Sequence, residues 1–282
     1  MKTIIQGMTG KEGQRMARWM IASGTEVVAG VTPGKGGQEV EGRPIFSSVA
    51  EAVAAFPDLQ ASSVAVPPFA VRSAVEDALN AGIPLVHVLT ENVPVHDVIL
   101  MRSLATQRGA MILGPSSVGM IEMPSFRLGY LGVESPFTTL VEGGLAILST
   151  SGGMTNEIVM ACGRRRIGVR AVMSLGGDRV AGTTLAEAIA RMETREDVKA
   201  IAIFVEPGNP WLREAAAPTK PTAVMLPGNA LESLPRGLPY GHTGTILGED
   251  EPRLVDVRSR IVAQGMRCTD RLSEFLDACE SL

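Results

Sequence analysis

The sequence predicts an α/β chain of two domains, each built on a mainly parallel sheet. Short apolar segments alternate with amphipathic segments, which is the pattern of parallel strands joined by right-handed helical crossovers. Glycine (31) and proline (18) are abundant and aromatic residues make up 4%, a balance that suits many tight strand–helix turns. A length of 282 residues is long for one core and comfortable for two domains.

The first half begins with an apolar strand at residues 3–6 and a helix at residues 11–22, whose apolar positions have amphipathic spacing. The alternation continues through strand 26–31, helix 48–55, strand 62–66, helix 69–81, strand 84–89, helix 95–108 and strand 110–113. This order predicts a parallel sheet covered by helices.

The second half repeats the plan, with strands at 144–149, 169–174, 200–205 and 222–226 and helices at 154–163, 185–191, 253–264 and 270–279. Residues 200–205 are continuously apolar, as in the buried centre of a parallel sheet. Glycine, proline and serine interrupt the periodicity between residues 114 and 142. We therefore predict two domains, at residues 1–122 and 123–282.

Composition and charge exclude several functions. The net charge of −4 gives no electrostatic basis for binding nucleic acid or an anionic membrane. Cys162, Cys268 and Cys279 have the spacing of neither a zinc site nor a disulfide framework. No apolar run reaches the roughly 18 residues that suggest a membrane-spanning helix, and no signal peptide is visible. We expect a cytoplasmic protein with reduced thiols and no bound metal.

A glycine-rich turn, QGMTGKEG at residues 6–13, lies between the first strand and the first helix. Such a turn lets main-chain amides and the helix N-terminus face a phosphate. A nicotinamide dinucleotide would also need an acidic residue at the end of the second strand. That strand instead ends in GVTPGKGG at residues 30–37, where Lys35 suits a further phosphate. CoA therefore fits better than NAD, although a solvated loop lysine is the alternative.

His242 lies between two glycines in YGHTGTI, residues 240–246. Flanking glycines let the main chain approach a ligand closely, and an imidazole there can act as a nucleophile or proton carrier. An ordinary loop histidine is the alternative. Glu206 ends the apolar strand 200–205, at the edge where ligands of α/β folds gather.

Several further motifs follow in a characteristic order: VPPF at 66–69, LTE at 89–91, GPSSVG at 114–119, STSG at 149–152, GGD at 176–178 and GHTG at 241–244. With the turns at 6–13 and 30–37, they resemble the succinyl-CoA synthetase α-subunit over essentially the whole chain. The resemblance implies a Rossmann-like CoA-binding domain followed by a flavodoxin-like ligase domain.

The resemblance also assigns roles to residues. His242 would be phosphorylated during turnover, and Glu206 would orient its imidazole. The positions implied for CoA are Thr9, Gly10, Lys11, Glu12, Lys35, Leu89, Thr90 and Glu91, and those implied for the substrate and phosphate loop are Ser151, Gly152 and Asn156. Ser151 is also expected to cap a helix that faces the phosphohistidine.

The implied reaction is nucleotide-dependent ligation of a small carboxylic acid to CoA, through an acyl phosphate and a phosphohistidine. An ATP-grasp β-subunit would supply the ATP or GTP and magnesium sites, in a heterodimer or a dimer of heterodimers. A carboxylate hydrogen-bonded to one imidazole nitrogen would fix the tautomer and leave the other nitrogen as the nucleophile.

The chain departs from the family pattern near the acid site. Asn156 replaces a usual tyrosine, Thr150 a usual arginine and Ser117 a usual cysteine, and PGNPW follows Glu206 instead of an Ile-Gly-Gly run. We therefore expect an acid other than succinate, such as malate, another small di- or hydroxy-acid, or a sulfonated carboxylic acid. A CoA-binding regulatory relative that has lost the reaction is the alternative. An NAD-linked dehydrogenase is disfavoured because the acidic residue after strand two is missing.

Overall fold

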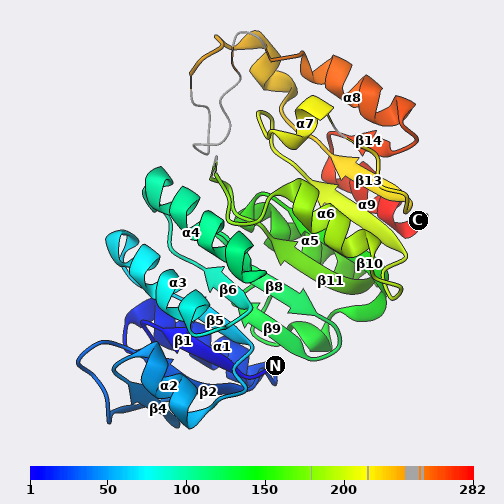
Figure 1. Cartoon of the computed structure of the whole chain (residues 1–282). Helices are drawn as coiled ribbons and strands as arrows, with labels where there is room; N and C mark the ends of the chain where they lie inside the picture. Colours follow the sequence, from blue (N-terminus) through cyan, green and yellow to red (C-terminus); the bar gives the residue numbers. More distant parts are fainter. Residues whose placement is uncertain (179, 215, 239–247, 249–250) are drawn as a thin grey trace.

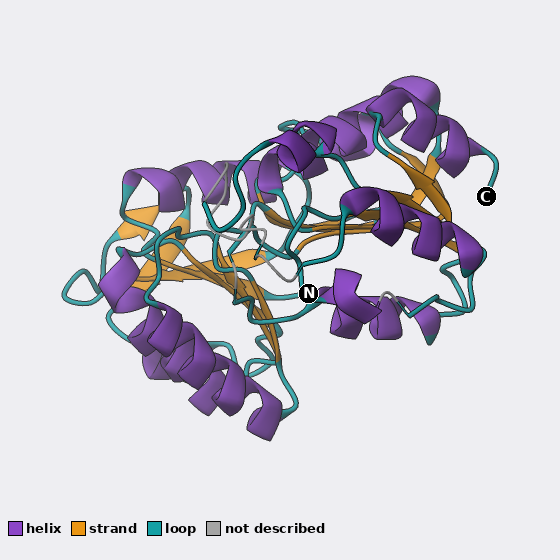
Figure 2. Cartoon of the chain, turned by 90° about the horizontal axis from the view of Figure 1, so that it is seen from above, coloured by secondary structure: helices purple, strands orange, loops and turns teal. Residues whose placement is uncertain are grey.

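The computed structural model describes residues 1–178, 180–214, 216–238, 248 and 251–282. Its strands form two sheets, an N-terminal one drawn in blue to cyan and a C-terminal one drawn in green to red (Figure 1). Helices cover both faces of each sheet (Figure 2). Within the described ranges no helix is long and apolar enough to span a bilayer.

The first sheet has the strand order β3-β4-β2-β1-β5-β6-β7, which is Rossmann-like. Every neighbouring pair is parallel except β3 and β4. The strands are β1 (Thr3–Gln6), β2 (Val27–Val31), β3 (Glu39–Val40), β4 (Arg43–Phe46), β5 (Ala61–Val64), β6 (Leu85–Val88) and β7 (Met111–Leu113). The helices are α1 (Lys11–Ala22), α2 (Val49–Ala55), α3 (Val71–Asn80) and α4 (Val95–Arg108). The strand order reverses between β1 and β5, which is where ligands of such sheets bind.

The second sheet has the order β14-β13-β12-β10-β11-β8-β9. The strands are β8 (Gly119–Glu122), β9 (Phe126–Gly129), β10 (Val141–Ser149), β11 (Gly168–Ser174), β12 (Ala200–Phe204), β13 (Thr222–Met225) and β14 (Arg267–Thr269). The helices are α5 (Gly152–Arg165), α6 (Leu185–Glu193), α7 (Trp211–Glu214), α8 (Leu254–Ala263) and α9 (Leu272–Glu280). The five strands from β10 to β14 are parallel in the flavodoxin-like order, and β8 and β9 extend the sheet as an antiparallel pair.

One continuous apolar core joins the two sheets. Met16 and Met20 of α1 pack in the same cluster as Leu128 of β9 and Leu185 of α6. The guanidinium of Arg127 is fully buried at this junction and donates hydrogen bonds to the main-chain oxygens of residues 19, 133 and 134. Burial lowers the pKa of Arg127 to about 10. Because this value is still well above neutral pH, the side chain stays charged there. The junction therefore ties α1 to β9 through polar contacts as well as apolar ones.

The alternation of strands and helices predicted from the sequence is confirmed. Strand 3–6 and helices 11–22 and 95–108 have the predicted bounds, and the other predicted elements are displaced by a few residues at their ends. The elements that the sequence did not indicate are β3, β4, β8, β9, β14 and α7. Strands β8 and β9 occupy the stretch interpreted as an interdomain break. The predicted division after residue 122 falls between them, although both belong to the second sheet.

A buried polar chain also connects the sheets. His87 is fully buried in β6, and its Nε2 lies 2.9 Å from the main-chain oxygen of Ser117. Because that oxygen can only accept, Nε2 carries the proton, and Nδ1 accepts from Ser63 Oγ at 3.2 Å. Ser117 Oγ in turn donates to the main-chain oxygen of Ser174 in β11 at 2.6 Å. His87 is thus a satisfied core residue.

Acidification is expected to destabilise the fold through His87. Burial lowers the pKa of His87 from its ordinary 6.5 to about 4, so the folded chain keeps the ring neutral after the unfolded chain has gained a proton. The contribution to the free energy of unfolding is complete above pH 6.5 and is lost as the pH falls toward 4, by about 3 kcal/mol. Urea unfolding at several pH values should show this loss in the wild type and a smaller one in His87→Gln, whose amide can still donate to Ser117. An equal pH dependence of the free energy of unfolding in the two proteins would contradict this role of His87.

Candidate functional site

The turn after β1 brings its glycines close against neighbouring main chain. Gly7 has a φ of +81°, and a Cβ there would lie 2.3 Å from the oxygen of Ala65. Gly10 is the N-cap of α1 and provides no side-chain cap. The first amides of α1 therefore face outward at the point where the strand order reverses, which is the geometry that receives a phosphate.

The turn after β2 lies next to the turn after β1. Thr9 Oγ1 donates to Thr32 Oγ1 at 3.3 Å and so joins the two turns. Lys35 is exposed in the second turn, where its main-chain amide donates to the Thr32 oxygen at 3.0 Å. An exposed lysine beside a helix N-terminus suits a ligand with more than one phosphate.

The segment after β6 closes the same edge of the sheet. Thr90 Oγ1 donates to the main-chain oxygen of Val66 at 2.7 Å, so its hydroxyl links the ends of β6 and β5. Glu91 is exposed beyond it. The predicted CoA positions thus all lie at the carboxyl edge of the first sheet, in three adjacent turns and the start of α1: Thr9, Gly10, Lys11, Glu12, Lys35, Leu89, Thr90 and Glu91.

The second sheet has a corresponding edge. Its strand order reverses between β10 and β12, and the segments that follow these strands meet there. The main-chain amide of Glu206 donates to Thr150 Oγ1 at 3.2 Å across this point. A small cleft at Glu206 is lined by Thr150, by residues 176–178 and by residues 207–210. The predicted carboxylate therefore stands at the ligand-binding edge of a flavodoxin-like sheet.

The start of α5 differs from the prediction in one respect. Ser151 is the N-cap residue, but its side chain makes no capping bond, so the expectation of a serine cap is wrong. Ser149 Oγ accepts from the Ser151 amide at 3.2 Å and donates to the Ser151 oxygen at 3.0 Å, which holds the turn in its place. Gly152 opens the helix, and its first turn contains no acidic residue.

Asn156 contacts a neighbouring loop. Its Oδ1 accepts from the main-chain amide of Gly132 at 2.7 Å, in the segment that joins β9 to β10. The side chain of Asn156 therefore has a structural partner on this chain. The residue lies one turn into α5, and its place in the substrate loop remains a prediction.

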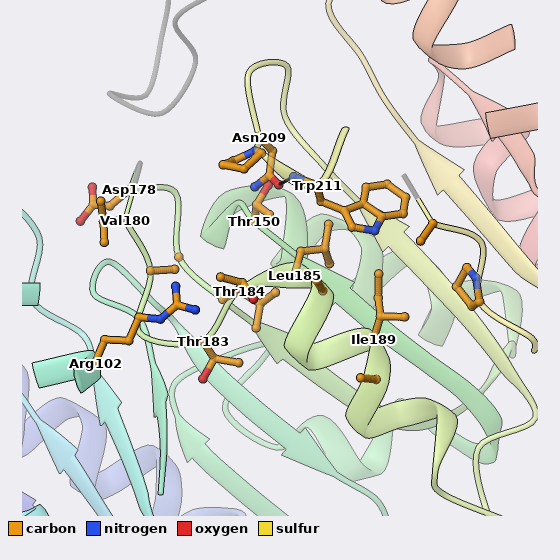
Figure 3. A pocket seen from close by; sticks show the side chains of 18 of the residues that line it. Arg102, Thr150, Asp178, Val180, Thr183, Thr184, Leu185, Ile189, Asn209 and Trp211 are labelled. Carbon is orange, nitrogen blue, oxygen red and sulfur yellow. Dashed lines mark hydrogen bonds between the residues drawn. The ribbon is translucent and has the colours of Figure 1, made fainter. Parts of the chain in front are cut away.

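A cavity of about 610 Å³ adjoins the cleft at Glu206 and shares Thr150 and Asn209 with it. Leu185, Ile189 and Trp211 give it an apolar wall, and Asp178 stands at its rim (Figure 3). Asn209 and Trp211 were not among the predicted site residues. The signal was present, because both belong to the stretch after Glu206 that departs from the family pattern.

The predicted nucleophile His242 lies outside the described residues. Among the residues that the structure does describe, no group of three or more histidine, cysteine, aspartate or glutamate side chains is arranged to hold a metal ion.

Comparisons with known proteins agree with this geometry. The CoA binding domain family matches residues 1–92, and the family described as succinyl-CoA ligase like flavodoxin domain matches residues 142–282. The predicted two-part α/β fold is confirmed.

Relatives that align over most of their length are named for different acids. The chain is 33% identical to an ADP-forming sulfoacetate-CoA ligase subunit of Bilophila wadsworthia, over 97% of this chain and 94% of the relative. It is 36% identical to the α-subunit of the ADP-forming succinate–CoA ligase of Aquifex aeolicus, over 87% and 80%. It is 31% identical to the malate–CoA ligase α-subunit of Methylorubrum extorquens, over 86% and 83%.

Among solved structures, ATP citrate lyase of Methanosaeta concilii aligns with 99% of this chain at a TM-score of 0.83 and 22% identity. The chain spans about half of that protein, 49% of its length. A dinucleotide-forming acetyl-coenzyme A synthetase of Ca. Korarchaeum cryptofilum aligns with 98% at a TM-score of 0.76 and 18% identity. These two likenesses concern the fold.

Proposed function

The chain belongs to the α-subunit family of ADP-forming acid–CoA ligases, and from that premise we propose that it joins a small carboxylic acid to CoA through a phosphohistidine and an acyl phosphate. The proposal rests on one observation: the main-chain amide of Glu206 donates a hydrogen bond to Thr150 Oγ1 at the point where the strand order of the second sheet reverses. A carboxylate fixed at that edge is in the place where a reacting imidazole would need an orienting partner.

In the proposed reaction, a nitrogen of His242 takes the γ-phosphoryl group of ATP or GTP, and the nucleoside diphosphate leaves. An oxygen of the acid's carboxylate then takes the phosphoryl group from the imidazole. The CoA thiol, having lost its proton, attacks the carbonyl carbon of the acyl phosphate, and inorganic phosphate leaves. Glu206 would accept a hydrogen bond from the other imidazole nitrogen and keep the reacting nitrogen unprotonated. The start of α5 would stabilise the phosphoryl charge.

The proposal needs a partner. An ATP-grasp β-subunit would hold ATP or GTP with magnesium, as the family resemblance implies. Several relatives carry the name of α-subunit, which supports a partner for this chain.

The acid is expected to be succinate or a related di- or hydroxy-acid, or a sulfonated acid such as sulfoacetate. Thr150, Asn209 and Trp211 line the cavity beside Glu206, and they are positions where this chain departs from the family pattern. We propose that this wall sets the preference among these acids. A panel in which succinate is the best substrate would contradict the expectation of a changed acid.

The test uses the complex isolated from its host and treated with Mg-ATP. Mass spectrometry under non-acidic conditions should find phosphate on His242, and CoA with one acid of the panel should discharge it. A complex that binds ATP yet gains no phosphate would instead indicate the CoA-binding regulatory relative.

Lys35 is expected to select CoA through its third phosphate. Lys35→Met should raise the Kd for CoA about tenfold, because a charge-assisted bond to phosphate is lost. The Kd for 3′-dephospho-CoA should change little. Lys2→Met is a matched control, since Lys2 pairs with Asp58 at 2.7 Å. Isothermal titration calorimetry measures both ligands, and an equal loss for both would contradict the assignment.

A further inference from the structure

A cluster of aromatic and charged side chains lies where the two sheets meet. Trp19 of α1 and Tyr130, the residue after β9, pack edge to face with ring centroids 6.0 Å apart. The guanidinium carbon of Arg15 lies 4.8 Å from the centroid of the Tyr130 ring and 5.3 Å from that of the Trp19 ring. These contacts hold the phenol ring in place between α1 and β9.

Tyr130 also reaches the proposed CoA site. Burial raises the pKa of the phenol, and Glu12 and Glu91 lie close enough to raise it further. Glu12 lies in the first turn of α1 and Glu91 in the segment after β6, both at the edge of the first sheet. Tyr130 thus belongs to the second sheet but faces the CoA turns of the first.

The strand directions put Tyr130 on the path between the two edges. β8 is antiparallel to β11, and β9 is antiparallel to β8, so β9 ends at the same edge as β10, β11 and β12. β9 is the outermost strand of the second sheet on the side of the first. Tyr130, the residue after β9, therefore lies at this edge of the second sheet and also packs against α1 of the first domain.

We propose that Tyr130 contacts the pantetheine arm of CoA as the arm crosses from the edge of the first sheet to the edge of the second. This inference rests on the proposed CoA site. The arm is neutral and carries amides and methyl groups, which suit a half-buried phenol with an apolar ring face. Arg15 holds that ring and places a positive charge among Glu12 and Glu91, two carboxylates that would otherwise repel an anionic ligand.

The test compares two ligands on the full chain with its partner subunit. CoA contains the arm, and adenosine 3′,5′-bisphosphate does not. Tyr130→Ala should raise the Kd for CoA about tenfold by calorimetry, the loss of one aromatic contact, and leave that for the bisphosphate within about twofold. Tyr130→Phe keeps the ring and should give a smaller loss, which also guards against a folding defect in the alanine variant.

Trp19 gives a second readout. The chain has two tryptophans, so in Trp211→Phe the emission that this chain adds to that of the partner subunit comes from Trp19 alone. CoA should change this emission, and the bisphosphate should not. Equal weakening of both ligands by Tyr130→Ala, or no weakening of CoA, would overturn the inference. A wild-type complex that binds neither ligand would overturn the proposed CoA site itself.

Discussion

Glu206→Gln is expected to slow phosphorylation of the complex by Mg-ATP by between about a hundredfold and ten-thousandfold, the range seen when an orienting or proton-transferring group is lost. Glutamine keeps the size of the side chain but loses the charge that would select the reactive tautomer of His242. The amide of residue 206 would still donate to Thr150 Oγ1, so the turn after β12 should be unchanged. The rate of phosphate incorporation, followed by non-acidic mass spectrometry, measures the effect.

Glu142→Gln is the matched control for this experiment. Glu142 lies near the start of β10, at the opposite edge of the same sheet, and its carboxylate pairs with Arg170 at 2.8 Å on the surface. Loss of this ion pair should leave the rate of phosphorylation within about twofold of the wild-type rate, because exposed ion pairs contribute little to stability. CoA affinity should be normal in both variants, since the proposed CoA residues lie on the other sheet. Normal phosphorylation in Glu206→Gln would remove Glu206 from the mechanism.

The order of strands and helices could be predicted because most core strands are apolar and most helices amphipathic. Residues 200–204 are a clear example, since every one is buried. Strand β5 is harder, because two of its four residues, Ser62 and Ser63, are polar and still fully buried. Ser63 is satisfied by His87 and Ser62 accepts from Gln6 at 3.1 Å, partners far away in the sequence. Short strands such as β3, with two residues, carry too few side chains to show a period.

The turns that form the site could be predicted from the sequence, but the contacts between these turns could not. That Lys35 and Thr9 lie in adjacent turns follows from the order of β1 and β2, which a βαβ pattern predicts. The contact of Tyr130 with Arg15 could not be predicted, because it depends on how the second sheet packs against α1. The buried Arg127 was missed for the same reason, since its acceptors are main-chain oxygens that no side-chain pattern marks.

Gly13→Ala is expected to weaken CoA binding strongly while sparing phosphorylation. A Cβ at residue 13 would lie 2.2 Å from the oxygen of Gly7 and 2.7 Å from the Cα of Met8, so the main chain of the turn has to move. The amides at the start of α1 would move with it, and a displacement of about 1 Å in a binding geometry costs on the order of a hundredfold. The Kd for CoA should therefore rise about a hundredfold by calorimetry, with an unchanged rate of phosphate incorporation from ATP.

Gly109→Ala separates this local effect from a general loss of stability. Gly109 caps α4 in the same domain with a φ of +64°, and a Cβ there would meet nothing within 4 Å. The substitution should reduce the free energy of unfolding by about 1 kcal/mol, because alanine is strained in the left-handed region. CoA affinity should stay normal, since Gly109 lies at the C-terminal end of α4, whereas the predicted CoA segment 89–91 precedes its N-terminal end. If Gly13→Ala bound CoA normally, the turn would not be the phosphate-binding element. If it also lost phosphorylation while Gly109→Ala kept it, the two edges would be coupled, and the packing of α1 against β9 is one path that would connect them.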